Sequence, residues 1–434
     1  MEKIVVLCLF VLTYVLIIAL PNQKVWTTGA IALVATIFLA IMGIIGWIDP
    51  IKSIKYDVIL MLGGIMLTVG VFADSNMPSL IADKIMSKMP GAVTAIVVVS
   101  LLSGFISAFV DNVATLLMLA PIGLAISKKI KVSPVPVLIS IAVLSNLQGA
   151  ATLIGDTTSI MLADAAGMNF FDFFFFNGRF SIFWIVELGS VAIIPVLIVL
   201  FRKQKKKLQI ESEEIKIKSI MPTVMILINM ILLICSSFIN KEIRLFGSSI
   251  TNGVICTVCG IIAVGLYSVS QKGKIKNCLR ESFDYQTVLF LVFLFVIIGC
   301  VERVGLIQDI ANMLSKIGTK NVFLLYTIIV FASVVFSAFI DNIPYVATML
   351  PVITGMAGSF EPKITIALYF GLLIGATLGG NLTPFGASAN IVATGILRKE
   401  GYEVRNRDFF RIGVPITIVA VLTGYVLTWL MWCL

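Results

Sequence analysis

Long apolar stretches separated by short polar loops make up most of the chain. Each stretch of about 17 residues or more is long enough to cross a hydrocarbon core as a helix. The predicted spans are 4–20, 25–47, 57–73 and 180–201 in the first half, and 219–239, 247–268, 285–301 and 410–432 in the second. An amphipathic stretch near 78–89 follows the third span, and a similar one follows 285–301. The pattern predicts an integral membrane protein without a soluble domain.

Four further apolar segments are interrupted by polar or glycine-rich sequence. The interrupted segments are 92–127 and 133–168 in the first half, and 321–357 and 363–397 in the second. They occupy the same places in the order of the two halves. Irregular backbone at membrane depth is tolerated only where protein covers it or a wet cavity meets it. The four interruptions therefore mark where the polar chemistry of this protein is expected.

The interruptions repeat in sequence as well as in position. Residues 107–112 read Ser-Ala-Phe-Val-Asp-Asn, and residues 337–342, shifted by 230, read Ser-Ala-Phe-Ile-Asp-Asn. Residues 152–159 correspond to 383–390 at a shift of 231. Internal duplication with polar breaks in lipid-like sequence is typical of secondary transporters whose binding site lies between two repeats.

The basic residues predict how the two halves are oriented. If 92–127 is a re-entrant hairpin, each half crosses the membrane five times, and an odd number inverts the second half. Most of the 32 Lys and Arg residues then lie in loops on the side of the linker 202–218, including the clusters at 128–131 and 272–280. The positive-inside rule places that side in the cytoplasm and both termini outside.

The predicted fold class is therefore an all-α integral membrane protein built from two inverted repeats of about five transmembrane helices. Each repeat contains a re-entrant hairpin and a broken helix. The predicted divisions are 1–201 for the first repeat, 202–218 for the cytoplasmic linker and 219–434 for the second repeat. The expected location is the cytoplasmic membrane, with several crossings.

Composition supports this class and excludes others. The chain is 59% hydrophobic and 13% charged, whereas charged residues make up about 25% of soluble domains. The net charge of +9 does not indicate a nucleic-acid partner, because the basic residues lie in short loops. Histidine is absent, which excludes an imidazole proton relay. Cys256 and Cys259 have a metal-like spacing but lie in an apolar helix without a second pair, so helix packing is expected.

The Asp-Asn pairs are the first candidates for a site. An Asp in an apolar span costs about 2.5–3.5 kcal/mol on insertion scales, and here it occurs at matched positions, Asp111 and Asp341. We expect both at hairpin tips, with Asn112 and Asn342 turning the chain. Carboxylates and free carbonyls suit Na⁺ or H⁺, whereas helix N-termini suit anions. Turn capping by Asp and Asn is the alternative, and the duplication favours a function.

The glycine-rich breaks supply the other candidates. Their hydroxyl, amide, carboxyl and permissive backbone groups are provided by Thr152, Gly155, Asp156 and Ser159 in the first break and by Thr383, Pro384, Ser388 and Asn390 in the second. Close helix packing by small residues is the alternative. Asp156 corresponds to Ala387, so the two half-sites are chemically unequal. Glu187, in the span 180–201, is either a proton-linked carboxylate or a partner for a buried base, and we place it outside the core site.

At these residues the chain resembles the ion transporter superfamily. That superfamily includes divalent-anion/sodium symporters for dicarboxylates and citrate, arsenite-efflux permeases, sodium/proton antiporters of the ArsB/NhaD type, and the melanosomal P protein. The resemblance covers nearly the whole chain and rests on Ser-Ala-Phe-x-Asp-Asn in both halves and on the two breaks. The second break reads Gly-Gly-Asn-Leu-Thr-Pro over 379–384, which adds Asn381 to the candidates. The resemblance implies a site between hairpin tips, a scaffold region that often dimerises, and a transport region that moves as an elevator.

Two departures from the superfamily bear on the substrate. The dicarboxylate branch has Ser-Asn-Thr at its hairpin tips, whereas this chain has Asp-Asn-Val and Asp-Asn-Ile. The extra carboxylates disfavour a di- or tricarboxylate and bring the chain closer to the P-protein and sodium/proton antiporter branch. In the first break the family often has Gly-Asp/Ser-Pro-Pro-Asn, whereas Thr-Thr-Ser follows Asp156 here, so the shape of this loop is not carried over.

The sequence thus predicts a secondary active transporter for a small ion, working by alternating access in a lipid bilayer, with Na⁺ or H⁺ as coupling ion and no other cofactor. Possible Na⁺ ligands are Asp111, Asn112, Asp341 and Asn342. Cation/proton antiport and transport of an anion or oxyacid, such as arsenite, citrate, a dicarboxylate or sulfate, both stay open. A channel is disfavoured because the polar residues cluster at the breaks. An ATPase partner stays open, although this chain has no phosphate-binding Gly-Lys-Ser/Thr loop. An enzyme is disfavoured because no nucleophile–base pair is evident.

Overall fold

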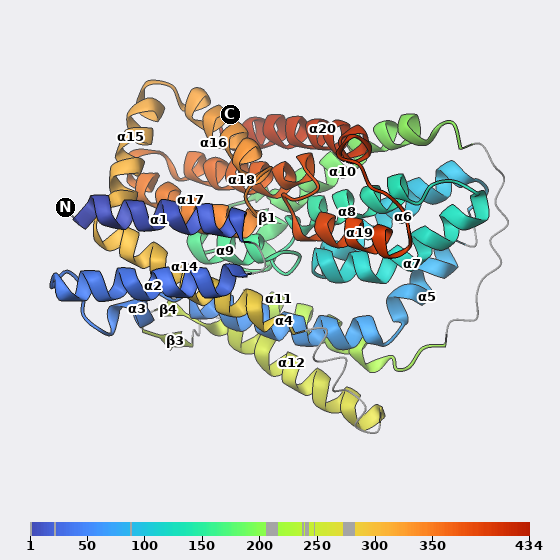
Figure 1. The fold of residues 1–434 in the computed structure, drawn as a ribbon, viewed down its shortest axis with the longest axis horizontal. Helices are drawn as coiled ribbons and strands as arrows, with labels where there is room; N and C mark the ends of the chain where they lie inside the picture. Colours follow the sequence, from blue (N-terminus) through green and yellow to red (C-terminus); the bar gives the residue numbers. More distant parts are fainter. Residues whose placement is uncertain are drawn as a thin grey trace.

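The computed structural model (Figure 1) describes residues 2–20, 23–86, 89–204, 216–236, 238, 243–246, 248–271 and 283–434. Most of the predicted linker 202–218 and the basic cluster at 272–280 lie outside these described residues. The fold is mostly helical, which confirms the predicted all-α membrane class. Two short antiparallel hairpins, with strands of two residues each, are the β-structure that the described residues contain.

The first half contains the predicted elements in the predicted order. Its helices are α1 (Glu2–Ala19), α2 (Lys24–Ile41), α3 (Asp49–Lys52), α4 (Tyr56–Asp74), α5 (Met77–Met86), α6 (Ala92–Ser107), α7 (Asn112–Ile130), α8 (Val135–Gly149), α9 (Thr157–Ala166), the short η2 (Phe171–Phe173) and α10 (Ile182–Phe201). The strands β1 (Phe175–Phe176) and β2 (Arg179–Phe180) precede α10. The expected span 25–47 is shorter than predicted, because α2 ends at Ile41 and Gly43 turns the chain at a φ of +69°.

The second half follows the same order. Its helices are α11 (Met221–Ser236), α12 (Thr251–Ser270), α14 (Tyr285–Arg303), α15 (Leu306–Lys320), α16 (Val322–Ser337), α17 (Asn342–Met356), η3 (Ala357–Ser359), α18 (Pro362–Gly379), η4 (Gly380–Leu382), α19 (Ser388–Lys399) and α20 (Asn406–Trp432). The strands β3 (Arg244–Leu245) and β4 (Ser248–Ser249) precede α12. Eight helices among the described residues are long and apolar enough to cross a membrane, so the chain is a multi-pass membrane protein.

The predicted interruptions separate pairs of helices. Helices α6 and α7 form one helical hairpin and α16 and α17 the other, and Figure 1 shows the two hairpins at opposite ends of the molecule. The broken helices are α8–α9 and α18–α19. Lys218 is the last residue of the predicted linker, and its backbone N–H donates to Ser75 O, between α4 and α5, at 3.0 Å. We therefore call the end of the molecule with α5 and Lys218 the linker end. The end with α3 and α15 is the opposite end (Figure 1).

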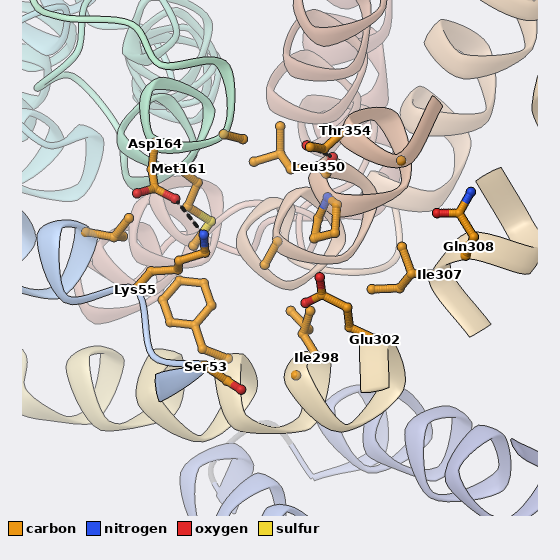
Figure 2. Close-up of a pocket in the computed structure, with 17 residues that line it drawn as sticks. Ser53, Lys55, Met161, Asp164, Ile298, Glu302, Ile307, Gln308, Leu350 and Thr354 are labelled. Carbon is orange, nitrogen blue, oxygen red and sulfur yellow. Dashed lines mark hydrogen bonds and ion pairs between the residues drawn. The ribbon is translucent and has the colours of Figure 1, made fainter. Parts of the chain in front are cut away.

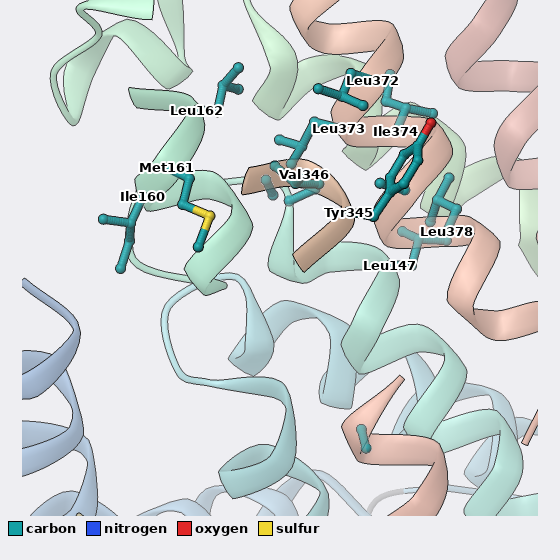
Figure 3. Packing of buried hydrophobic residues seen from close by; sticks show 14 of the residues in the cluster. Leu147, Ile160, Met161, Leu162, Tyr345, Val346, Leu372, Leu373, Ile374 and Leu378 are labelled. Atoms are coloured by element: carbon teal, nitrogen blue, oxygen red, sulfur yellow. The ribbon is translucent and has the colours of Figure 1, made fainter. Parts of the chain in front are cut away.

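The broken helices occupy the centre of the molecule. Every residue of α8 except Pro136 is buried, and α18 is buried over almost its whole length. Figure 3 shows how Leu147 of α8 and Leu378 of α18 lie with Tyr345 and Val346 of α17 in one apolar cluster. Helices that are apolar all round are buried in the core of a large protein or span a membrane. Here the central pair is covered by protein, so its irregular ends are shielded from lipid.

Close packing of α4 on α12 explains the spacing of Cys256 and Cys259. Both thiols are buried, and a Cβ added at Gly64 of α4 would overlap the backbone of Cys256 and Thr257. Gly260 of α12 faces Gly64 O in turn. No group of three or more Cys, Asp or Glu that suits a metal occurs among the described residues. These cysteines lie at a tight helix crossing.

This crossing leads to a first prediction. Gly64→Ala will force α4 and α12 apart, because the backbone of Cys256 cannot move as a side chain would. Overpacking of this kind costs about 2 kcal/mol, so the melting temperature of the purified protein in detergent will fall. Gly265→Ala is the matched control, since a Cβ there meets nothing within 4 Å. Equal melting temperatures for the two variants would contradict the close approach.

Candidate functional site

The two Asp-Asn pairs adopt the same backbone and different side-chain roles. Asp111 precedes α7 and its Oδ2 accepts hydrogen bonds from the backbone N–H of Val113 at 3.0 Å and of Ala114 at 3.1 Å. Asp341 precedes α17 with nearly the same φ and ψ but makes no side-chain cap. Helices α7 and α17 begin at Asn112 and Asn342. The prediction that these asparagines turn the chain is therefore wrong, since the turns end at the aspartates.

Polar side chains of each break hold its backbone to the neighbouring hairpin. Thr152 donates to Ala108 O, and the equivalent Thr383 donates to Ala338 O at 2.5 Å. Within the breaks, Ser159 donates to Gly149 O and the equivalent Asn390 donates to Gly380 O, both at 3.1 Å. These four predicted site residues thus bind backbone carbonyls. Pro384 lies in the turn that follows η4.

Two equivalent glycines fit between backbone carbonyls at these junctions. A Cβ added at Gly155 would lie 2.6 Å from Gly149 O and 2.9 Å from the carbonyl oxygens of Ser107 and Ala108. A Cβ at Gly386 would lie 2.6–2.9 Å from the carbonyls at the equivalent positions 380, 337 and 338. Only a residue without a side chain allows each break to touch its hairpin. Each junction therefore brings several main-chain oxygens together at the hairpin tip.

A buried amide network joins the two halves. Asn112 donates to Asn146 Oδ1 at 2.9 Å, and Asn146 Nδ2 lies 2.7 Å from Asn381 Oδ1 and 3.1 Å from Asn390 Oδ1. Asn381 in turn donates to Val143 O at 3.1 Å. Asn146 is fully buried in α8 and was not among the predicted residues. An amide inside a predominantly apolar segment was the signal that could have found it, since buried polar groups need partners.

Asp156 makes the second connection between the halves. Its Oδ2 accepts from Thr158 Oγ1 at 2.9 Å and from Asn342 Nδ2 at 3.2 Å. The first break thus binds the tip of the second hairpin. The equivalent position in the second break is Ala387, so the first tip has no matching carboxylate there and bonds to Asn146 instead.

A cavity of about 450 Å³ opens beside this junction. It is lined by Asp111, Asn112, Asp156, Thr157, Asn342 and Ser388 of the junction, and by Asp74, Ser79, Asp284 and Thr287 near the linker end. Four of its lining residues are carboxylates, and none of the described lining residues is Lys or Arg. Helices α7, α9, α17 and α19 all begin at residues that line it. Asp74 and Asp284 also line this cavity, although the sequence did not indicate them as site residues.

A second cavity of about 400 Å³ lies at the opposite end (Figure 2). Its lining includes Lys55 and Asp164, which form an ion pair at 3.1 Å, and Glu302 of α14. Several lining positions are equivalents of those in the first cavity. Leu117 and Pro121 correspond to Ala347 and Pro351 at the shift of 230. Helices α4 and α14 begin at Tyr56 and Tyr285, a shift of 229, at which Lys55 and Val58 correspond to Asp284 and Thr287. None of the predicted site residues lines this second cavity. The junction is therefore open toward the linker end.

The other predicted site residues do not line the first cavity: Thr152, Gly155, Ser159, Asp341, Asn381, Thr383, Pro384 and Asn390. Asp341 has a separate partner, and so does Glu187, which the sequence places outside the core site. Asp341 Oδ2 lies 3.6 Å from Lys24 Nζ. Glu187 Oε2 accepts from Gln148 Nε2 at 3.3 Å, and Gln148 also donates to Ser190 Oγ at 2.9 Å. Of the two alternatives for Glu187, a basic partner is not seen among the residues that the structure describes.

Comparison with known proteins agrees with this architecture. The family described as citrate transporter matches residues 14–371 of this chain. The chain belongs to the citrate transporter family. An uncharacterised transporter of Mycobacterium tuberculosis (strain H37Rv) is 29% identical over 434 residues, covering 99% of this chain and 98% of its own. The P protein of Homo sapiens is 25% identical over 477 residues, covering 91% of this chain and 56% of its own.

Solved transporters share the fold of this family member at low sequence identity. The YdaH transporter of Alcanivorax borkumensis aligns with a TM-score of 0.55 at 13% identity, covering 91% of this chain and 88% of its own. The antimetabolite efflux pump MtrF of Neisseria gonorrhoeae aligns with a TM-score of 0.55 at 14% identity, covering 91% and 83%. The matched family region includes both Asp-Asn pairs and the first break. The protein is a membrane transporter of the citrate transporter family.

Proposed function

We propose that the protein is a secondary active transporter that moves a small ion by alternating access, coupled to Na⁺ or H⁺, with cation/proton antiport favoured. We place it in the cytoplasmic membrane, with the linker end inside and both termini outside. The proposal combines the positive-inside bias of the loops with the junction of hairpin tips and broken helices, where each half contributes one of each.

The charge of the linker-end cavity carries this proposal. Asp74, Asp111, Asp156 and Asp284 line it, and its described lining contains no base. Such a cavity raises the local concentration of cations and repels anions. Asp74 is paired with Lys218 at 2.8 Å, but Asp111 and Asp156 at the junction lack a cationic partner among the described residues. A cation or proton is the species that best compensates these two carboxylates.

Compensation also supplies a physical basis for coupling. At the junction of the hairpin tips Asp156 is buried and Asp111 is half-buried. A carboxylate carried through a low-dielectric barrier is costly unless it is paired or protonated. A cation bound at a tip, with help from the main-chain oxygens around Gly155 or Gly386, would remove that cost. Movement of the site would then follow the binding of the coupling ion.

The two cavities support alternating access. One opens beside the junction at the linker end, and the other lies at the opposite end with equivalent lining positions. In transporters with inverted repeats, exchange of conformation between the repeats moves the opening from one side to the other. The structure then corresponds to the state that faces the linker end, and the second cavity would become the opening of the other state.

One observation favours a second candidate, a permease for an anion or oxyacid such as arsenite, citrate, a dicarboxylate or sulfate. Four helices begin at the first cavity, and helix N-termini present free N–H groups and a positive dipole end to an anion. Asp111 uses two of these N–H groups of α7 for its own carboxylate, which weakens that attraction. The family's description as citrate transporter supports this candidate.

Proteoliposomes that contain an internal pH dye will separate the two. Under the antiport proposal, external Na⁺ or Li⁺ changes the lumenal pH, and Asp111→Asn lowers the rate at least about tenfold, the scale of a lost coupling. Asp341→Asn should do the same. Asp309→Asn is the control, because Asp309 pairs with Lys3 at an exposed position. If Na⁺ and Li⁺ do not change the lumenal pH, and arsenite or citrate is taken up in a way that depends on Asp111, the antiport proposal is wrong and the anion permease is supported.

A further inference from the structure

The two hairpin tips are equivalent in sequence but use their carboxylates differently. Asp111 is bound to the N-terminus of its own helix, whereas Asp341 leaves that of α17 without a side-chain cap. Asp341 Oδ2 instead faces Lys24 Nζ at 3.6 Å, and its Oδ1 is buried without a hydrogen-bond partner in the described structure. The carboxylate of the second tip is thus turned outward from its hairpin toward another helix.

Lys24 belongs to a helix pair that docks on the second hairpin. It is the first residue of α2, and Tyr14 of the preceding helix α1 donates to Pro344 O of α17 at 2.8 Å. The ammonium group of Lys24 also lies 5.2 Å from the ring centre of Phe290 in α14. An ammonium over an aromatic face is attracted by the ring. Lys24 is therefore held at the tip by both a carboxylate and a ring.

The ammonium of Lys24 approaches one oxygen of the Asp341 carboxylate, Oδ2, and leaves Oδ1 without a hydrogen-bond partner in the described structure. Lysine is a compact point charge that binds as a simple cation does, so it compensates Asp341 where an alkali cation would otherwise bind. The side chains of both residues are partly exposed, which allows Lys24 to leave. Breaking such a pair without replacement would leave a carboxylate uncompensated at the tip.

We propose that Lys24 is a positioning residue that competes with the coupling cation for Asp341. With Lys24 in place, the second tip is held to α2. A Na⁺ or Li⁺ ion that binds Asp341 displaces the ammonium and frees the hairpin from α2. This inference rests on the proposed coupling to a cation, and it gives the two tips different parts: the first tip binds its cation without a competitor, and the second exchanges a cation for Lys24.

The test is a titration of the purified full-length protein with Na⁺ or Li⁺, in which the melting temperature is measured at each cation concentration. Choline replaces the cation so that the ionic strength stays constant. The half-stabilising concentration is the cation concentration that gives half of the maximal rise in melting temperature. In Lys24→Gln it will be about tenfold lower than in wild type, a usual scale for coupling between two ligands. Lys24→Arg retains a cationic side chain and will behave as wild type. Lys3→Gln, which breaks an ion pair of α1 with Asp309, controls for general loss of charge.

Asp341→Asn decides whether the shift acts through the second tip. In that background, removing Lys24 should no longer change the half-stabilising concentration. A lower melting temperature of Lys24→Gln at the wild-type half-stabilising concentration would indicate a purely structural role and overturn the inference, as would an absence of stabilisation by either cation in every variant. The proposed transport function is judged separately, because it fails only if wild-type proteoliposomes show no coupled movement.

Discussion

Gly155→Ala and Gly386→Ala will each slow transport strongly and lower the stability of the protein. A methyl group at either position would lie 2.6 Å from one carbonyl oxygen and no more than 2.9 Å from two others. These oxygens belong to the main chain of a hairpin and of a break, so the methyl group can be accommodated only by separating the two. We expect a loss of about 3 kcal/mol and, because the tip is displaced from its partners, a transport rate roughly 100-fold lower.

The transport rate and the melting temperature will be measured on the same preparations. A slow variant that is still folded at the assay temperature has a displaced hairpin tip rather than an unfolded chain. Gly395→Ala is a matched control in α19, since a Cβ there meets nothing within 4 Å and alanine favours a helix over glycine. It should retain wild-type transport. If Gly155→Ala transports normally while the control does too, the close contact between break and hairpin is not needed for function. A defect confined to one of the two equivalent glycines would show that the halves contribute unequally.

The hairpins and breaks were predictable because their sequence motifs occur in both halves of the chain. A single Asp-Asn pair or a single glycine-rich break has an ordinary explanation in turn capping or helix packing. The same features in the same order, 230 residues apart, drew attention to Asp111, Asp156 and Asn342, which the structure brings to one cavity. The capping explanation nevertheless holds for Asp111 as well, since its carboxylate binds the N–H groups of its own helix.

Contacts between distant parts of the chain were not predictable in the same way. Lys24 stands more than 300 residues from Asp341, and nothing in the apolar periodicity of α2 indicates which helix it faces. Asn146 and Asp284 have no equivalent of their own type in the other half, where Thr377 and Lys55 stand, so the duplication did not mark them. The sequence predicts the hydroxyls of Thr152 and Thr383 as candidates for ion or substrate binding, and it gives no sign that they also donate to carbonyls of the hairpins.

These differences have a common consequence for the mechanism. The two halves share their backbone plan, including the carbonyl contacts of Gly155 and Gly386. They differ in the groups that carry charge, because Asp156 has Ala387 as its counterpart and Lys24 approaches the second tip. Equivalent backbones would let the two repeats exchange conformations. Unequal charges would make the two tips respond to different events, which suits a transporter that must couple two ions.

Asn146→Leu will uncouple the two halves at their centre. Asn146 accepts from Asn112 and lies within hydrogen-bond distance of Asn381 and Asn390. A leucine of similar size would leave the buried Asn112 amide and the buried Asn381 carbonyl without their shared partner. Each unsatisfied buried group costs about 1–3 kcal/mol, so we expect a loss of about 2–4 kcal/mol and a transport rate at least tenfold lower.

The control for Asn146 is its equivalent in the other half. Thr377 is fully buried, and its hydroxyl has no hydrogen-bond partner in the described structure. Thr377→Val keeps the shape, removes no bond and should leave the melting temperature unchanged or slightly higher. Asn146→Asp keeps a polar side chain with an acceptor for Asn112 but loses the N–H that binds the second half. It therefore tests whether a polar side chain is sufficient at this position or the N–H is needed. If Asn146→Leu melts and transports as Thr377→Val does, the amide network does not couple the repeats, and other contacts between them, such as that of Asp156 with Asn342, must do so.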